Sequence, residues 1–90
     1  MKIEQTLSFK SKIKKLHKNQ LAEVEGAIRT ICADPTLGVR KKGDLAEAYV
    51  HKFKIKTVLH LLAYRWYEEE CLLRLLHLGT HENFYRDLKH

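Results

Sequence analysis

Histidine and cysteine are the side chains of this sequence that could hold a metal or act as nucleophiles. There are six histidines and two cysteines. Zinc sites are built from such side chains at short spacings, and a Cys-x-x-Cys pair is a typical sign of one. Cys32 and Cys71 stand far apart, and no histidine lies near a Cys-x-x-Cys pair. The spacing therefore predicts free thiols and no metal site.

Basic side chains form the second set with chemical potential, and they are unevenly distributed. Residues 1–56 hold thirteen Lys and Arg against six Asp and Glu, whereas residues 57–90 hold four against five. The net charge of +6 therefore comes from the first 56 residues. Such a surplus favours a polyanionic partner. A lysine-rich surface that serves only solubility explains the charge equally well.

Length and composition limit the class of protein. Ninety residues, 44% hydrophobic and 31% charged, are typical of one globular domain, so we expect residues 1–90 to form a single domain. The longest apolar run is far shorter than the ~18 residues of a membrane span. The N-terminal segment lacks the apolar stretch of a signal peptide. We therefore expect a cytoplasmic protein with no membrane partner.

The first half of the sequence predicts a strand and two helices. Apolar and polar residues alternate over 2–8, which indicates a short strand. Apolar residues then recur at helical spacing over 9–17, with Ser8 as a possible N-cap. A second helix is expected between Asn19, a possible N-cap, and Asp34, which precedes a proline. The two helices should pack as a hairpin.

The second half predicts a sheet. Residues 36–44 contain two glycines and three consecutive cations and indicate a loop. Residues 49–56 alternate with period two and carry lysines on one face, which predicts a half-buried strand. Apolar strands are expected over 58–67 and 71–79. A short helical segment is expected over 80–90, with Thr80 as its possible N-cap.

These elements predict the fold class. We expect an α+β domain in which an N-terminal strand precedes a two-helix hairpin packed on a curved antiparallel sheet, followed by a short C-terminal helical segment. The hairpin is the only cover available for the apolar face of the sheet. The other face should remain open.

Four features of the second half carry a family resemblance. They are Lys42-Gly43-Asp44-Leu45 before the sheet, the strand pattern from Tyr49 to Lys54, the apolar strand ending at Tyr64, and the closing segment from Leu78 to Tyr85. Together with the order of elements, they resemble the RelE/ParE superfamily of bacterial type II toxins over essentially the whole chain. Residues 41–89 look most like ParE-like toxins. The Gly-Thr-His ending is also similar to YafQ-type mRNA interferases.

The resemblance implies a RelE/ParE-like fold and a toxin that arrests growth, neutralised by a cognate antitoxin protein, with no small-molecule cofactor. It implies two different targets. RelE-like members cleave mRNA on the ribosome, whereas ParE members are not nucleases and inhibit DNA gyrase. A third possibility is a member without toxicity that acts as an antitoxin-binding co-repressor.

The resemblance also implies roles for particular residues. His81 corresponds to the histidine of the Gly-Thr-His motif, which is catalytic in YafQ-type enzymes, and Tyr85 corresponds to their aromatic residue. Lys52 and Lys54 resemble the alternating basic pair of RelE-type toxins. His60 stands where RelE-type sequences usually have an arginine that contacts nucleic acid.

Cleavage of RNA by its own 2′-hydroxyl group needs a base, an acid and cations that stabilise the charge on phosphorus. His81 could serve as base or acid, because an ordinary imidazole titrates near pH ~6.5. Phosphates could be held by Lys52, Lys54 and Arg86. Tyr85 could stack on a nucleobase or donate a hydrogen bond from its hydroxyl.

Each of these residues also has a purely structural interpretation. His81 could cap the start of the last helix, and the lysines of strand 49–56 could protect an edge strand from aggregation. His51 and His77 share their faces with apolar residues, which favours hydrogen-bonded core histidines. The sequence leaves the choice between a nuclease, a gyrase inhibitor and a co-repressor open.

Overall fold

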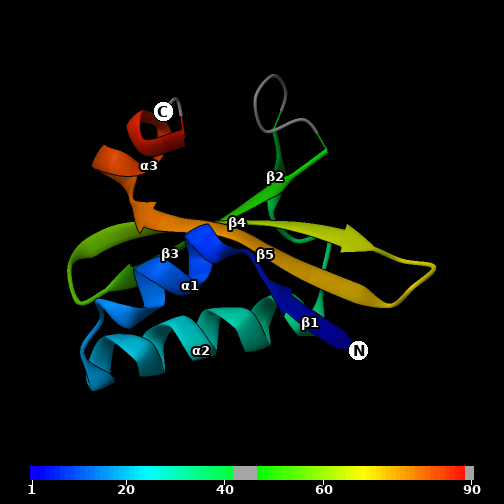
Figure 1. Ribbon diagram of the computed structural model, residues 1–90, viewed down its shortest axis with the longest axis horizontal. Helices are drawn as coiled ribbons and strands as arrows, with labels where there is room; N and C mark the ends of the chain where they lie inside the picture. Colours follow the sequence, from blue (N-terminus) through cyan, green and yellow to red (C-terminus); the bar gives the residue numbers. More distant parts are fainter. Residues whose placement is uncertain (42–46, 89–90) are drawn as a thin grey trace.

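The computed structural model describes residues 1–41 and 47–88, and it packs two helices on one side of a sheet and a third on the other (Figure 1). The Lys42-Gly43-Asp44-Leu45 motif lies outside the described residues. No helix in the two described ranges is long and apolar enough to cross a membrane. In chain order the elements are β1 (Lys2–Gln5), α1 (Leu7–Lys14), α2 (Lys18–Ala33), β2 (Val39–Arg40), β3 (Tyr49–Ile55), β4 (Val58–Tyr67), β5 (Leu72–Thr80) and α3 (His81–Leu88).

The strands form one sheet in the order β1-β5-β4-β3-β2. β3, β4 and β5 are antiparallel neighbours, as the alternating pattern predicts. β1 instead pairs in parallel with β5, with Lys2 beside Leu72 and Gln5 beside Leu75. The short strand β2 lies within the predicted loop 36–44 and extends the opposite edge. The expected α+β class is confirmed, and the sheet is mostly antiparallel.

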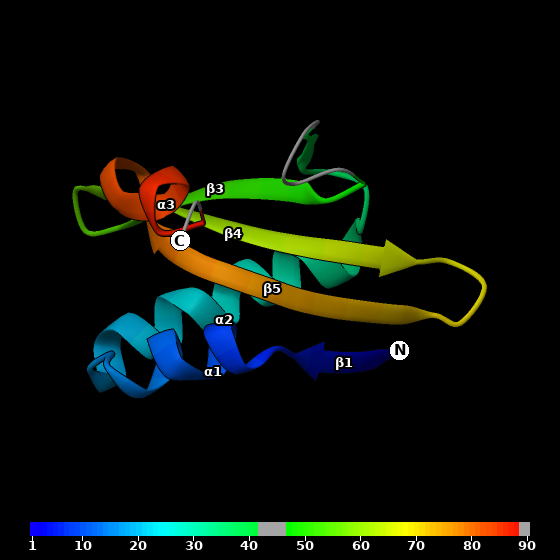
Figure 2. The same cartoon turned by 45° about the horizontal axis from the view of Figure 1, so that its top comes forward.

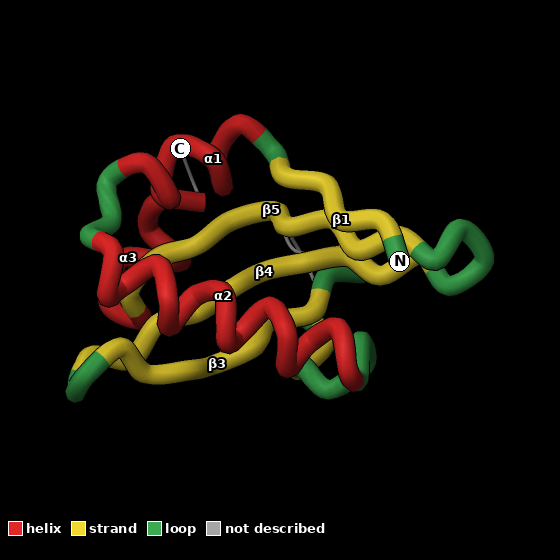
Figure 3. Tube along the Cα trace, turned by 90° about the horizontal axis from the view of Figure 1, so that it is seen from below, coloured by secondary structure: helices red, strands yellow, loops and turns green. Residues whose placement is uncertain are grey.

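Helices α1 and α2 cover one face of the sheet, α1 along β5 and α2 across β3 and β4 (Figures 2 and 3). The main core lies between these two layers. Burial of each large apolar side chain there contributes about 1.5–3 kcal/mol. Its fully buried members are Phe9, Val24, Ile31, Leu62, Tyr64, Leu73 and Leu75.

Tyr64 joins this core to the loop after α2. Its hydroxyl donates to the Pro35 carbonyl oxygen (2.8 Å) and accepts from the Gly38 backbone N–H (3.1 Å). Its ring stacks on Tyr49 with centroids 5.4 Å apart. Burial raises the pKa of the Tyr64 phenol. A Cβ at position 38 would lie 2.9 Å from this hydroxyl, so only glycine fits there.

The first boundaries differ from the prediction. Thr6, rather than Ser8, is the N-cap of α1, because its Oγ1 accepts a backbone N–H of the first turn (3.1 Å) and donates to the Leu76 carbonyl oxygen (2.6 Å). β1 therefore ends at Gln5. α2 begins after His17, ahead of the expected cap at Asn19.

The sheet face opposite α1 and α2 is not entirely open. Side chains alternate along β3, so Lys52 and Lys54 share this second face with Val50. α3 lies over one end of it, and Phe84 is completely buried there. The prediction of an open face is therefore wrong at this end, where a small second core consists of Val50, Leu61, Ala63 and Phe84.

Candidate functional site

His81 is the first residue of α3, immediately after the end of β5. Thr80 pairs with His60 of β4, and its Oγ1 accepts the backbone N–H of Asn83 (3.3 Å). This bond caps the first turn of α3. The His81 side chain itself is exposed. Thr80 is thus the N-cap that the sequence predicts, the alternative of a capping role for His81 is wrong, and the imidazole remains accessible.

The strand register places Lys52 at the end of the sheet from which His81 follows. Lys52 pairs with Leu61, and Leu61 pairs with Gly79, so these residues form one row across three strands. Two inter-strand spacings of ~4.8 Å place the backbones of Lys52 and Gly79 about 10 Å apart. Lys52 and Lys54 are both exposed on the second face. The fold therefore brings the predicted lysine pair and the predicted histidine to the same end of the sheet.

Phe84 fixes the position of α3. It is 0% exposed and packs on the second face, with its ring centroid 5.2 Å from that of His77. His77 is itself buried, and its Nδ1 lies 2.9 Å from the Ser8 hydroxyl. His77 is thus a hydrogen-bonded core histidine, as the sequence pattern favours. Its contacts hold the helix that carries His81.

Arg86 and Tyr85 belong to the same helix. Arg86 is exposed, and its guanidinium donates to Asn83 Oδ1 (2.7 Å), which orients it toward the start of α3. Tyr85 lies one turn after His81 in α3. Its side chain is outside the part of the structure that is described, so its predicted role stays a prediction.

His60 lies on the other side of the sheet. It pairs with Phe53 and Thr80 on the face covered by α1 and α2, and it is 8% exposed. The rings of His60 and Phe53 lie 5.8 Å apart. His60 is therefore not on the same surface as Lys52 and Lys54. The nucleic-acid contact predicted for His60 therefore stays a prediction.

His51 also lies on the helix-covered face. It is half-buried and stacks on Phe53, with centroids 6.1 Å apart. Burial lowers the pKa of His51, because desolvation disfavours the imidazolium. This environment fits a packing role.

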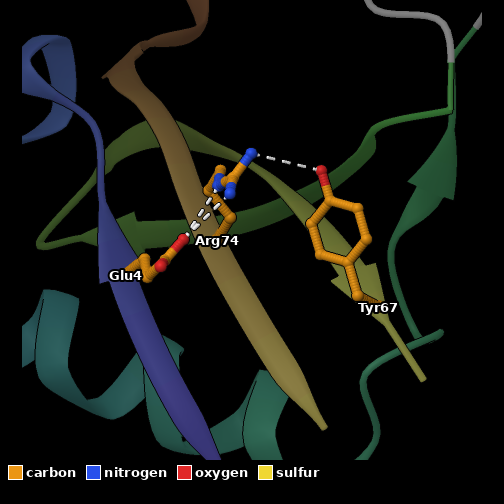
Figure 4. A network of polar contacts seen from close by, with 3 residues as sticks. All are labelled: Glu4, Tyr67 and Arg74. Carbon is orange, nitrogen blue, oxygen red and sulfur yellow. Dashed lines mark hydrogen bonds and ion pairs between the residues drawn. The ribbon is translucent and has the colours of Figure 1, made fainter. Parts of the chain in front are cut away.

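The network around Arg74 is a second polar cluster, which the sequence analysis did not find (Figure 4). Arg74 donates from Nε to Glu4 Oε1 (3.1 Å), and its Nη2 lies 3.0 Å from the same oxygen. Its Nη1 donates to the Tyr67 hydroxyl (3.4 Å), and its guanidinium lies 5.3 Å from that ring's centre. The cluster ties β1 to β5. Glu4 and Arg74 are neighbours only because β1 pairs in parallel with β5, and no local sequence pattern shows that pairing.

No metal-ligand cluster is found among residues 1–41 and 47–88, where no three His, Cys, Asp or Glu side chains gather. Cys32 and Cys71 are free thiols. The candidate site therefore consists of an exposed imidazole, exposed cations and the helix that positions them.

A small mixed sheet with two helices on one face, and with cations and an imidazole at the edge of the other, defines a compact basic α+β protein. Residues 3–89 match the family described as the ParE-like toxin of type II bacterial toxin-antitoxin systems. The chain belongs to this family and is a toxin of a type II toxin-antitoxin system. No curated protein matches the chain.

Solved structures show the same fold. The YoeB/ParE toxin from Agrobacterium tumefaciens is 22% identical, with a TM-score of 0.72 over 90% of this chain and 99% of that one. A chain of the RelBE2 toxin-antitoxin complex from Mycobacterium tuberculosis is 21% identical, with a TM-score of 0.74 over 89% and 96%. A chain of the intact Escherichia coli RelBE complex is 14% identical, with a TM-score of 0.69 over 87% and 93%. These likenesses establish the RelE-like fold.

Proposed function

We propose that this toxin arrests growth by cleaving mRNA on the ribosome, with His81 as the acid or base. The observation that carries the proposal is the accessible imidazole of His81 at the same end of the sheet as the exposed Lys52 and Lys54. A helix start with a merely structural role needs no exposed imidazole, since Thr80 already caps the helix.

The remaining residues contact the phosphate and the nucleobase of the RNA. Lys52 and Lys54 stabilise the negative charge that develops on phosphorus as the 2′-hydroxyl attacks. Arg86, held by Asn83, contacts a neighbouring phosphate. Tyr85 stacks on a base or donates its hydroxyl. A positioned acid or base contributes about 10²- to 10⁴-fold to the rate, so the loss of His81 should be clearly measurable.

The partner that controls this activity is a cognate antitoxin. Two of the structural relatives are chains of toxin-antitoxin complexes. The positive charge of residues 1–56 suits an acidic, disordered segment that folds on binding. Complex formation should weaken as salt is added. The cytoplasm is the compartment in which the toxin meets both this antitoxin and the ribosome.

DNA gyrase inhibition is the second candidate, and the ParE-like family description favours it. An inhibitor that works by contact alone makes no chemical use of His81. The lysines and α3 would then form a binding surface. A family member without toxicity, retained as an antitoxin-binding co-repressor, is the third alternative.

Expression without antitoxin separates these functions. A ribosome-dependent nuclease cuts mRNA within coding regions and leaves DNA intact, and His81→Ala relieves the arrest. A gyrase inhibitor produces filamentous cells and trapped DNA cleavage complexes, and it tolerates His81→Ala. A co-repressor causes no arrest. If Lys52 and Lys54 stabilise the phosphate charge, Lys52→Gln and Lys54→Gln should also weaken cleavage. Lys18→Gln is their matched control, because it removes the same charge at an exposed position on α2.

A further inference from the structure

Strand β1 forms one edge of the sheet. It is the outermost strand in the order β1-β5-β4-β3-β2, and in the described chain its one neighbouring strand is β5 (Figure 2). All four residues of β1 are exposed. A hollow of about 620 Å³ borders β1 and reaches α1, so a further strand has room beside this edge. The unpaired backbone groups of such an edge are a template for another strand.

The hydrogen bonds of β1 show which residues face the free edge. Lys2 donates its backbone N–H to the Cys71 carbonyl oxygen (2.9 Å), and Thr6 donates its own to a carbonyl oxygen of β5 (3.1 Å). The backbone groups of successive residues in a strand point to alternate sides. The N–H and C=O groups of Ile3 and Gln5 therefore point away from β5. They are a matched set of donors and acceptors for a neighbouring strand.

The side chains of β1 are complementary to themselves about Ile3. Lys2 and Glu4, which have opposite charges, flank Ile3 and lie on the second face of the sheet, where Glu4 pairs with Arg74. Ile3 lies on the helix-covered face beside Leu73 and is 47% exposed. Both contacts from Arg74 reach Oε1 of Glu4, which leaves Oε2 for another cation (Figure 4). An antiparallel copy of this strand, centred on Ile3, carries Lys2 opposite Glu4 at both positions.

We propose that β1 pairs antiparallel with β1 of a second copy of this chain, about a two-fold axis at Ile3. Ile3 and its counterpart exchange both of their backbone hydrogen bonds, which are the ones that point to the free edge. Lys2 of one copy then lies opposite Glu4 of the other in a pair without backbone bonds, where side chains approach most closely. The two Ile3 side chains bury exposed apolar surface against each other. This pairing does not depend on the proposed nuclease activity.

The association should be weak, because β1 has only four residues. Such a contact buries less surface than the ~1,200–2,000 Å² of a stable protein interface. We therefore expect a dissociation constant on the order of 0.1 mM. Two copies that each carry a net charge of +6 also repel one another. Salt at about 0.15 M limits this repulsion to a range of about 8 Å, so the measurement is made at that ionic strength.

Sedimentation velocity between about 10 µM and about 1 mM protein measures the association. Lys2→Glu and Glu4→Lys each place like charges opposite one another at both positions, and each should weaken self-association at least about tenfold. An equimolar mixture of the two variants restores opposite charges at both positions, so it should associate about as strongly as the wild type. Lys18→Glu, the same charge reversal at an exposed position on α2, is the control and should change the dissociation constant less than about twofold.

Hydrogen exchange of the wild type locates the contact. The Ile3 and Gln5 amides should exchange more slowly as the protein concentration rises, whereas the Thr6 amide, already bound to β5, should not change. A mixture of the two variants that stays monomeric, while urea denaturation shows both to be folded, would overturn the proposal. A monomeric wild type would overturn it as well, and protection of the Ile3 amide only in the antitoxin complex would then assign this edge to the antitoxin.

Discussion

Replacing Phe84 by alanine tests whether α3 is held on the sheet as described. Phe84 is completely buried against a small apolar patch of β3 and β4. Truncation of a buried Phe to Ala typically costs about 3–5 kcal/mol. Because α3 is a helix of only 8 residues and can detach instead of leaving a cavity, we expect the lower value, about 3 kcal/mol. A domain of this length has roughly 5–14 kcal/mol of stability, so the variant should still fold.

Urea denaturation measures this loss. With a slope of about 1.5 kcal/mol per molar urea, a cost of 3 kcal/mol lowers the midpoint by about 2 M. Leu7→Ala is the control, because Leu7 is 84% exposed and its truncation should cost less than about 0.5 kcal/mol. Phe84→Ala should also weaken growth arrest although His81 is unchanged. A midpoint equal to that of the wild type would refute the packing of α3 on the sheet.

Three further predictions concern the scaffold. Tyr64→Phe removes the hydroxyl that serves both Pro35 and Gly38, and calorimetry should show a loss of about 1–3 kcal/mol. Gly38→Ala forces a Cβ to within 2.9 Å of the Tyr64 hydroxyl and 3.0 Å of the Val50 carbonyl oxygen, so it should lose about 1–3 kcal/mol; an unchanged midpoint would contradict the tight fit. Burial holds the pKa of His51 in the folded state below its ordinary value of 6.5, so the unfolded chain binds more protons and stability falls as pH drops through and below 6.5. His51→Phe should make this decline shallower in denaturation curves at pH 7 and pH 5, and an equal decline in both proteins would count against it.

The sequence predicted the elements that have strong periodic patterns. The alternation of Tyr49 to Ile55 and the long apolar run of β4 gave the central antiparallel strands correctly. The helical spacing in residues 9–33 gave the hairpin that covers them. These patterns report which side of an element is buried, and that is largely a local property.

The errors came from contacts between distant parts of the chain. Thr6 caps α1 while its hydroxyl is fixed by the Leu76 carbonyl oxygen, seventy residues away, and no local pattern contains that partner. The pairing of β1 with β5 is likewise nonlocal. The docking of α3 through Phe84 was also missed, since one aromatic residue in a short helix does not show which face it covers.

The candidate site was partly predictable for the same reason. The resemblance of the Gly-Thr-His ending singled out His81, and alternation placed Lys52 and Lys54 together. Their proximity to one another follows only from the register of β3, β4 and β5. The sequence analysis grouped His60 with these lysines. His60 pairs with Phe53, however, and side chains alternate along a strand, so it lies on the opposite face from Lys52 and Lys54, next to Lys15 and Asn83.

The central claim is that the exposed imidazole of His81, at the same end of the sheet as Lys52, performs RNA cleavage. Primer extension on mRNA bound to purified ribosomes, with wild-type toxin and His81→Ala side by side, tests it most directly. We expect discrete cuts with the wild type and a rate at least about 100-fold lower with the variant. Intact mRNA with the wild type, or equal cutting by both proteins, would contradict the claim.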